Sequence, residues 1–262
     1  MDFIKGEIIA IDKPYRMSSF GALAHCRWVL TQHMGQKVKV GHAGTLDPLA
    51  TGVLILCTGR CTKQIEELQN HTKEYVAGLQ LGATTDSYDK EHEVNATYPT
   101  THITRQLIDD VLPRFVGDID QVPPSYSACK IEGERAYKMR RNGEEVNLKP
   151  KHIHIDEIEV VDFDAEKMLL TLRVVCGKGT YIRALARDLG RALQSGAYLT
   201  SLRRTRVGEY KVENCVDFDH FDEWVTETLD KKNNKEKEYK YEIITVRFRS
   251  SGREHCPLSS QF

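Results

Sequence analysis

One aspartate is set in a sequence that could support covalent or acid–base chemistry. Asp47 lies in "GHAGTLDPLATGVLILCTGR" (residues 41–60), where a glycine-rich loop runs into an apolar segment. A carboxylate on such a loop can act as a nucleophile or a base, and a cation such as Arg183 would keep it ionised after desolvation. The alternative is structural, because an aspartate followed by Pro48 is typical of a helix N-terminus, with the carboxylate as the cap. The local residues alone favour the structural interpretation.

Other candidates are weak when they are taken singly. Tyr75 and Tyr181 fall at the start of an expected strand and an expected helix, where a tyrosine usually packs in the core and makes one hydrogen bond. His42 can be a surface residue or a packed one. The stretch "CGKGTY" (176–181) fails as a nucleotide loop, since Leu172 stands where the phosphate-binding motif needs a glycine. A nucleotide-triphosphate function is therefore not expected.

The seven cysteines are spread singly along the chain. Cys57 and Cys61 form the nearest pair, and a zinc site would need two further ligands, for which His152 and His154 are weak candidates. Buried free thiols are the favoured interpretation, and no metal is expected.

Charge is distributed unevenly, although the formal net charge is -1. Residues 213–230 carry seven acids and no lysine or arginine, so the other residues together carry a net charge of +6. The basic stretches at 178–191 and 203–211 suit a phosphate-rich partner and suit an ordinary solvated surface equally well. No apolar run approaches the roughly 20 residues of a membrane span, and the N-terminus lacks a signal-peptide pattern. We therefore expect a cytoplasmic protein.

Hydrophobic periodicity outlines the elements that must position these residues. Strands are expected at 6–14, 73–86, 152–164, 168–176 and 207–216, and helices at 18–35, 103–117, 179–196 and 217–230. The helix at 179–196 places Arg183, Arg187 and Arg191 on one face. Intermixed strands and helices predict an α/β fold of the mixed α+β kind. Residues 231–262 are expected to form a charged, loosely held tail.

Several motifs occur together and in order along the chain. They are "DKPYRMSS", "GHAGTLDPLATGVLILCTG", "CTK", "KEY", "LGATTDSYD", "VPPSYSACKIEGERAYKMRRNG", "CGKGTYIRALARDLG" and "LTSLRRTRVG". Over residues 7–225 the chain resembles the TruB family of tRNA pseudouridine-55 synthases. The resemblance implies a pseudouridine-synthase fold with a central, largely antiparallel mixed sheet flanked by helices. It also implies an isomerase that acts on a uridine in the T loop of tRNA, with no cofactor or metal, no membrane and no obligatory protein partner.

The resemblance also assigns residues to roles by their place in the motifs. Asp47 corresponds to the catalytic aspartate, Tyr75 to the active-site tyrosine and Arg183 to the partner of the aspartate. The residues assigned to the substrate or the RNA are Tyr181 in the pocket, His42 against the unstacked RNA loop, Leu202 as an apolar wall, and Lys13, Lys63 and Asp89 in their motifs. Whether Asp47 attacks the sugar or removes a proton from it is left open.

The chain departs from the family pattern in places. Arg16 stands where many relatives carry glycine, and "SYDKEHE" (87–93) lacks a glycine often found in that loop. Many members carry a C-terminal RNA-binding PUA domain, which is not expected here. RNA would then be held by a catalytic domain at 1–230, with an exposed RNA-contacting excursion at 122–151, and not by the tail at 231–262. Two alternatives stay open: a guide-RNA-dependent pseudouridine synthase, and an RNA-binding or RNA-folding protein whose catalysis is secondary.

Overall fold

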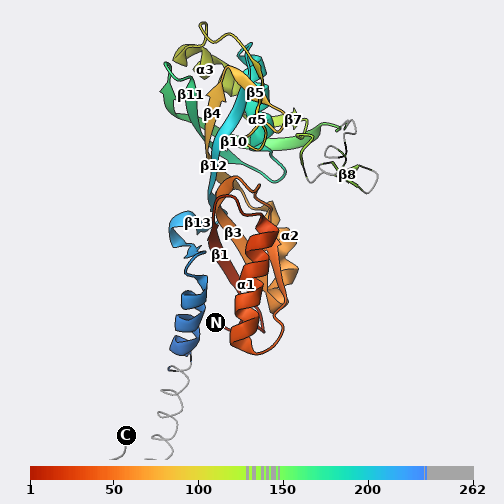
Figure 1. Cartoon of the computed structure of the whole chain (residues 1–262), viewed down its shortest axis with the longest axis vertical. Coiled ribbons are helices and arrows are strands. Elements are labelled where there is room, and N and C mark those ends of the chain that lie inside the picture. The colour runs from red at the N-terminus through yellow and green to blue at the C-terminus, as the bar shows by residue number, and fades with distance from the viewer. Residues whose placement is uncertain are drawn as a thin grey trace, which may run out of the picture.

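The computed structural model describes residues 1–127, 130–131, 134–136, 139, 142, 146, 148–232 and 234 (Figure 1). The strands are β1 (Ile8–Lys13), β2 (Val40–Ala43), β3 (Ala50–Thr58), β4 (Lys73–Leu81), β5 (Ala83–Thr85), β6 (Val94–Thr97), β7 (Gly117–Gln121), β8 (Lys130–Ile131), β9 (Glu134–Arg135), β10 (Lys151–Asp164), β11 (Leu169–Cys176), β12 (Ala197–Val207), β13 (Tyr210–Lys211) and β14 (Val216–Asp217). The α-helices are α1 (Ser19–Met34), α2 (Ile65–Asn70), α3 (Arg105–Val111) and α5 (Ile182–Ala192), and the 3-10 helices are η1 (Gly59–Gln64), η2 (Leu112–Phe115) and η3 (Val212–Asn214). Residues 221–232 are also helical.

One large mixed sheet organises the part of the chain that the structure describes. Its strand order is β14-β1-β3-β12-β4-β11-β10-β7, with β2 added to β3 and β13 added to β12. The pairs β1–β14 and β3–β12 are parallel, and the other recorded pairs in this sheet are antiparallel. The expected α/β fold with a central, largely antiparallel sheet is therefore confirmed.

Strand β12 lies at the centre of the sheet, between two groups of elements that pack separate cores. It pairs with β4 along most of its length and with β3 only from Leu202 to Arg204. Residues of β4, β10, β11, α3 and α5 form one hydrophobic core, and residues of α1, β1, β3 and the helix at 221–232 form another. Figure 1 shows β12 at the junction between these two groups of elements. A residue on β12 can therefore contact both halves of the molecule.

Most of the expected elements form where their sequence signals place them. Helix α1 begins after Ser18, whose hydroxyl accepts a hydrogen bond from the amide of Gly21 at 3.0 Å, and ends at Gly35, which has a left-handed φ of 62°. Strand β4 alternates between buried and half-buried positions, as expected for 73–86. The helix predicted at 103–117 is shorter, because Pro113 falls within the final 3-10 turn, η2.

Three expectations near the sheet centre and the C-terminus were wrong. Asp47 does not cap a helix: a turn follows it, and Ala50 begins β3, whose apolar run is buried on both faces of the sheet. No element was expected at 197–206, which holds all of β12 except its last residue. The strand predicted at 207–216 is divided among the end of β12, β13, η3 and β14.

The C-terminal helix is displaced from its expected bounds. It was predicted at 217–230, but it begins at 221 because β14 occupies Val216–Asp217 first. It continues through 231 and 232, and residue 234 is also helical. The rest of the tail, 233 and 235–262, lies outside the described residues, as does much of the predicted excursion at 122–151.

Gly52 allows β3 and β12 to approach each other. It has a φ of 103°, and a β-carbon added there would lie 2.1 Å from the carbonyl oxygen of Arg204. Both the backbone conformation and the space therefore require glycine. This close approach lets β12 pair in parallel with the first residues of β3, next to the loop that carries Asp47.

Two non-glycine residues take up left-handed backbone in the loops that depart from the family pattern. Arg16 has a φ of 62° and Tyr88 a φ of 57°. Such a conformation is uncommon for residues with a β-carbon. At Arg16 the glycine-like backbone is therefore retained although glycine is absent from this position.

The cysteine expectation is confirmed for the described residues. Cys26, Cys57 and Cys176 are buried free thiols, and Cys61 and Cys215 are half-buried free thiols. His152 and His154 lie near Asp120 and Asp118 instead of near a cysteine pair. No group of three or more potential metal ligands is found among the described residues. Within the same residues, no helix is both long and apolar enough to cross a membrane.

Candidate active site

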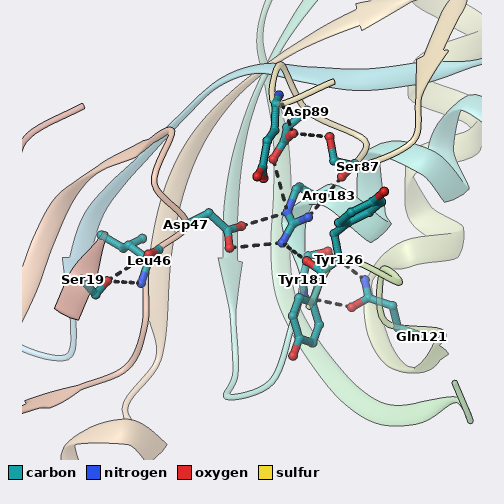
Figure 2. Close-up of polar contacts among 10 residues, drawn as sticks. Ser19, Leu46, Asp47, Ser87, Asp89, Gln121, Tyr126, Tyr181 and Arg183 are labelled. Carbon is teal, nitrogen blue, oxygen red and sulfur yellow. Dashed lines mark hydrogen bonds and ion pairs between the residues drawn. The ribbon is translucent and has the colours of Figure 1, made fainter. Parts of the chain in front are cut away.

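The loop that carries Asp47 connects β2 to β3. Hydrogen bonds from Ser19 and Lys13 hold its backbone in place. The Ser19 hydroxyl accepts a hydrogen bond from the Leu46 amide at 2.8 Å and donates one to the Leu46 carbonyl at 2.9 Å (Figure 2). The Lys13 ammonium is fully buried and donates to the carbonyl oxygens of Pro14 at 2.8 Å, Met17 at 2.6 Å and Pro48 at 3.4 Å. These bonds secure the backbone on both sides of Asp47.

Lys13 therefore lies beneath the loop, where its ammonium is occupied by backbone carbonyls. The resemblance assigned this lysine to substrate or RNA binding. We propose that its part in the site is to hold the loop that carries Asp47. The site depends on a buried cation that has no carboxylate within ion-pair distance among the described residues.

We predict that the Lys13 contribution to stability rises with pH above about 8. Burial lowers the pKa of Lys13 from 10.5 to about 8, although the nearby Asp47 charge opposes this shift. Between these values the unfolded chain binds more protons at Lys13 than the folded chain does, so the free energy of unfolding increases with pH. Wild type should gain about 1 kcal/mol over Lys13→Met between pH 8 and pH 9.

Urea denaturation of both proteins at the two pH values measures this gain. Other titrating groups are common to both proteins and cancel in the difference. Lys5→Met is a matched control, because Lys5 is exposed on the surface. A difference between wild type and Lys13→Met that does not change with pH would contradict the assignment.

Arg183 holds the Asp47 carboxylate in a two-point ion pair. Its Nε lies 2.8 Å from Oδ2 of Asp47, and its Nη2 lies 3.1 Å from Oδ1 (Figure 2). The Arg183 side chain is 5% exposed and that of Asp47 is 38% exposed. The carboxylate therefore reaches the solvent side of the site while its cationic partner stays inside, which is the pairing that the motifs predicted.

Arg183 is itself held by groups from two other segments. Its Nη1 donates to the carbonyl of Ser87 at 3.1 Å, and its Nη2 donates to the carbonyl of Tyr126 at 3.0 Å. Asp89 lies 3.7 Å from the Arg183 Nε. Burial alone would lower the pKa of Arg183, but Asp47 and Asp89 outweigh it and raise the pKa. The guanidinium is therefore a permanent charge with little freedom to turn.

The start of α5 is aligned by β7. The Gln121 side chain accepts a hydrogen bond from the Tyr181 amide at 2.9 Å and donates one to the Tyr181 carbonyl at 3.2 Å. Tyr181 is the residue before α5 and is half-buried. This pair of bonds fixes the first turn of the helix, and with it the direction of Arg183.

Tyr75 lies on β4, close to the Asp47 loop, and is buried beneath the molecular surface. It is 9% exposed and packs in the core around β4 and α5. Burial raises the pKa of the Tyr75 phenol, while the charge of the Arg204 guanidinium opposes the rise. The structure thus places a buried phenol, a carboxylate and two guanidinium groups around one loop.

An open cavity, about 290 Å³ with the solvent at its mouth included, lies over the ion pair. Four residues that the motifs selected line it: Asp47, Asp89, Arg183 and Leu202. The remaining lining residues are Leu49, Ala50, Lys90, Leu199, Thr200 and Ser201. The last three belong to β12, which the hydrophobic pattern did not identify, although the motif "LTSLRRTRVG" contains them.

A bulge in β12 shapes one wall of this cavity. The register between β12 and β4 shifts between Leu199 and Ser201. A β-carbon added to Gly78 on β4 would lie 2.6 Å from the Ser201 hydroxyl and 2.9 Å from the Thr200 hydroxyl. Bulges re-aim side chains next to functional sites, and here the bulge depends on the glycine opposite.

Two further predicted residues lie away from the cavity lining. His42 lies on β2, and burial, followed by the Arg204 charge, lowers its pKa. Lys63 is exposed on η1. Both are near the Asp47 loop in sequence, and neither touches the ion pair. Their assignment to RNA stays a prediction.

The comparison with known families decides the relationship. The model of the TruB family pseudouridylate synthase N-terminal domain matches residues 31–182, and the model of the tRNA pseudouridylate synthase B C-terminal domain matches residues 183–242. The chain belongs to the TruB family. It is thus a pseudouridine synthase, an isomerase. The boundary between the two matches falls in the first turn of α5, so Asp47 and Tyr75 lie in one match and Arg183 in the other.

Members of the TruB family from several bacteria resemble the chain over most of its length. It is 59% identical to tRNA pseudouridine synthase B of Bacteroides thetaiotaomicron over 86% of this chain and 95% of that protein. It is 54% identical to tRNA pseudouridine synthase B of Parabacteroides distasonis over 87% and 97%, respectively.

Solved structures resemble the chain in fold. One is a chain from the crystal structure of a Cbf5-Nop10-Gar1 complex, with a TM-score of 0.63 and 28% identity over 86% of this chain and 57% of that one. Another is from an H/ACA RNP bound to a substrate RNA containing 2'-deoxyuridine, with a TM-score of 0.60 and 26% identity over 86% and 56%. The TruB-family chain thus spans little more than half the length of these structural relatives.

Proposed function

We propose that this TruB-family chain converts a uridine in the T loop of tRNA, at position 55, to pseudouridine. The observation that carries the proposal is the ion pair of Asp47 and Arg183 at the base of an open cavity walled by Leu202. It is supported by relatives named tRNA pseudouridine synthase B that match the chain over nearly their whole length.

Asp47 is the group that acts on the sugar in this proposal. The reaction breaks the N1–C1′ bond of the uridine, turns the base and joins C5 to C1′, with no change of oxidation state. The carboxylate either attacks C1′ or removes a proton from the sugar. Arg183 keeps Asp47 ionised, since an adjacent cation favours the charged form of a carboxylate. The cycle uses only groups of the protein and of the RNA, and needs no cofactor or metal.

The target base must leave its stack to reach Asp47, so base flipping is part of the proposal. The uracil would occupy the cavity beside Leu202, with Tyr181 near the helix start. His42, Lys63 and Lys90 would face the RNA around it. RNA selection would rest on the shape of the loop and on splayed bases.

The excursion at 122–151 is the second RNA-contacting part of the proposed catalytic domain, 1–230. Its first residues are joined to α5: the Arg187 guanidinium donates to the Val122 carbonyl at 2.8 Å, and Arg183 binds the Tyr126 carbonyl. Because this segment is hydrogen-bonded to Arg183 and Arg187, RNA contacts to it can affect the position of the ion pair. The cytoplasmic location expected from the sequence suits a tRNA substrate.

Incubation of the purified full-length chain with an unmodified tRNA transcript tests the proposal. We expect pseudouridine at one T-loop uridine, mapped by carbodiimide labelling and primer extension, without any other protein or guide RNA. A transcript with cytidine at that position is the control and should gain no pseudouridine. Modification that requires an added guide RNA would favour the guide-dependent alternative, and RNA binding without modification would favour a folding role.

A further inference from the structure

Arg204 is the largest fully buried side chain among the described residues, at 1% exposed. It lies on β12 between two registered neighbours, Gly52 on β3 and Tyr75 on β4. Because directly opposed residues on adjacent strands lie on the same face of a sheet, the side chains of Arg204 and Tyr75 share one face. The mechanism proposed above assigns Arg204 no part.

The Arg204 guanidinium is bound by neutral oxygen atoms. Its Nε donates to the Val53 carbonyl at 2.8 Å and its Nη2 donates to the Gly44 carbonyl at 3.3 Å. Its cross-strand neighbour Tyr75 is close enough for the guanidinium charge to lower the pKa of the phenol. Within the described part of the chain, no carboxylate forms an ion pair with it. Burying a charge without a counter-ion costs folding free energy. We therefore infer that the Arg204 charge has a function.

Gly44 belongs to the loop that carries Asp47, so Arg204 connects the phenol to that loop. Burial opposes formation of a phenolate most, and the Asp47 charge opposes it too. Arg204 is the cation that favours it. The phenolate is the form that can accept a proton, and Arg204 lowers the free-energy cost of reaching that form.

We propose that Arg204 is a positioning residue for Tyr75, holding the phenol oxygen beside the Asp47 loop and stabilising it as the acceptor of the C5 proton. This inference rests on the proposed function and deepens it. Arg204 touches neither the sugar nor the base and acts through Tyr75.

The step that Arg204 serves is the last one of the isomerisation. After C5 has bonded to C1′, the C5–H bond breaks and its proton passes to the Tyr75 phenolate. The electron pair of that bond becomes the C5=C6 double bond, and the electrons of the C6=N1 bond move to N1, which takes a proton from water. Tyr75 returns its proton to solvent before the next cycle. Atoms and electrons balance without any further reactant.

Single-turnover kinetics with 5-deuterouridine at the target position test the inference. In Arg204→Met we expect the rate to fall by roughly 10²-fold, the scale of a lost proton-transfer group, and the isotope effect to increase because C5 deprotonation limits the rate. Arg204→Lys should recover part of the rate. Arg203→Met is the matched control, since Arg203 is the next residue on β12 but pairs with Asp12 at 2.6 Å and is half-exposed.

A merely structural role for Arg204 would slow every step and leave the isotope effect unchanged, and that outcome overturns the inference. A second measurement covers the case in which Arg204→Met does not fold. Site-specific 3,5-difluorotyrosine at position 75 ionises more readily than tyrosine, so it should restore the rate of Arg204→Lys. No restoration would also count against the inference. Failure of the proposed function is separate, because wild type would then make no pseudouridine on the same transcript.

Discussion

Replacing Asp47 by alanine is expected to lower the rate of pseudouridine formation by on the order of 10⁴-fold or more, the scale of removing a group that acts directly on the substrate. The loop should keep its place, because Ser19 binds the backbone of Leu46 and Lys13 binds that of Pro48. Arg183 also keeps the carbonyls of Ser87 and Tyr126. Single-turnover assays on an unmodified transcript measure the loss.

The matched variant is Asp47→Asn, which keeps the shape of the side chain but removes its charge. It should be as inactive as Asp47→Ala, while both variants bind the transcript within a few-fold of wild type in a filter assay. Activity within tenfold of wild type in either variant would exclude Asp47 as the group that acts on the sugar. Weak RNA binding by both would instead show that Asp47 supports the fold of the loop.

Replacing Arg183 by methionine is expected to damage both activity and stability. The change removes two bonds to Asp47 and two bonds to backbone carbonyls, and it leaves the buried Asp89 without its nearby cation. Breaking a buried ion pair from one side costs about 3–5 kcal/mol, and the exposure of Asp47 places this pair at the lower end of that range. We expect a loss of about 3 kcal/mol in the free energy of unfolding and a fall in rate of roughly 10³-fold or more.

Urea denaturation and single-turnover assays measure the two effects of Arg183→Met. Arg191→Met is the control, because Arg191 is exposed on the last turn of the same helix and should change stability by only a few tenths of a kcal/mol. Arg183→Lys keeps a charge but not the planar two-point geometry, so it should recover stability more than activity. An Arg183→Met variant as stable and active as wild type would refute the role of the pair.

Sequence reasoning succeeded where a motif fixed the residue and failed where only periodicity was available. The pairing of Asp47 with Arg183 was predicted from motifs 136 residues apart, and the two side chains are in contact. The same aspartate was misread from its neighbours, because Asp-Pro begins helices in many proteins and the buried apolar run that follows lacks the alternation of a surface strand.

Strand β12 was not predicted from the sequence, and the reason is physical. Its sequence mixes serine, threonine and three arginines, which by pattern indicates a loop or a basic surface. Two of its polar side chains lie on a bulge against Gly78, and Arg204 is buried against β3 and β4. Burial of so polar a strand depends on partners that are distant in the chain. Local propensity carries no information about those partners.

The position of β12 also bears on how the chain is made. Leu202 pairs with Ala50, yet β4, β10, β11 and α5 all come between them in the chain. During synthesis β3 and β4 therefore emerge long before the strand that separates them, each with an open edge of the kind that invites aggregation. When β12 is inserted, it closes both edges and delivers Leu202 and Arg204 to the site in a single event. A nascent chain that holds Asp47 and Tyr75 but lacks β12 has no complete cavity wall, so completion of the sheet sets the moment at which the enzyme can first act.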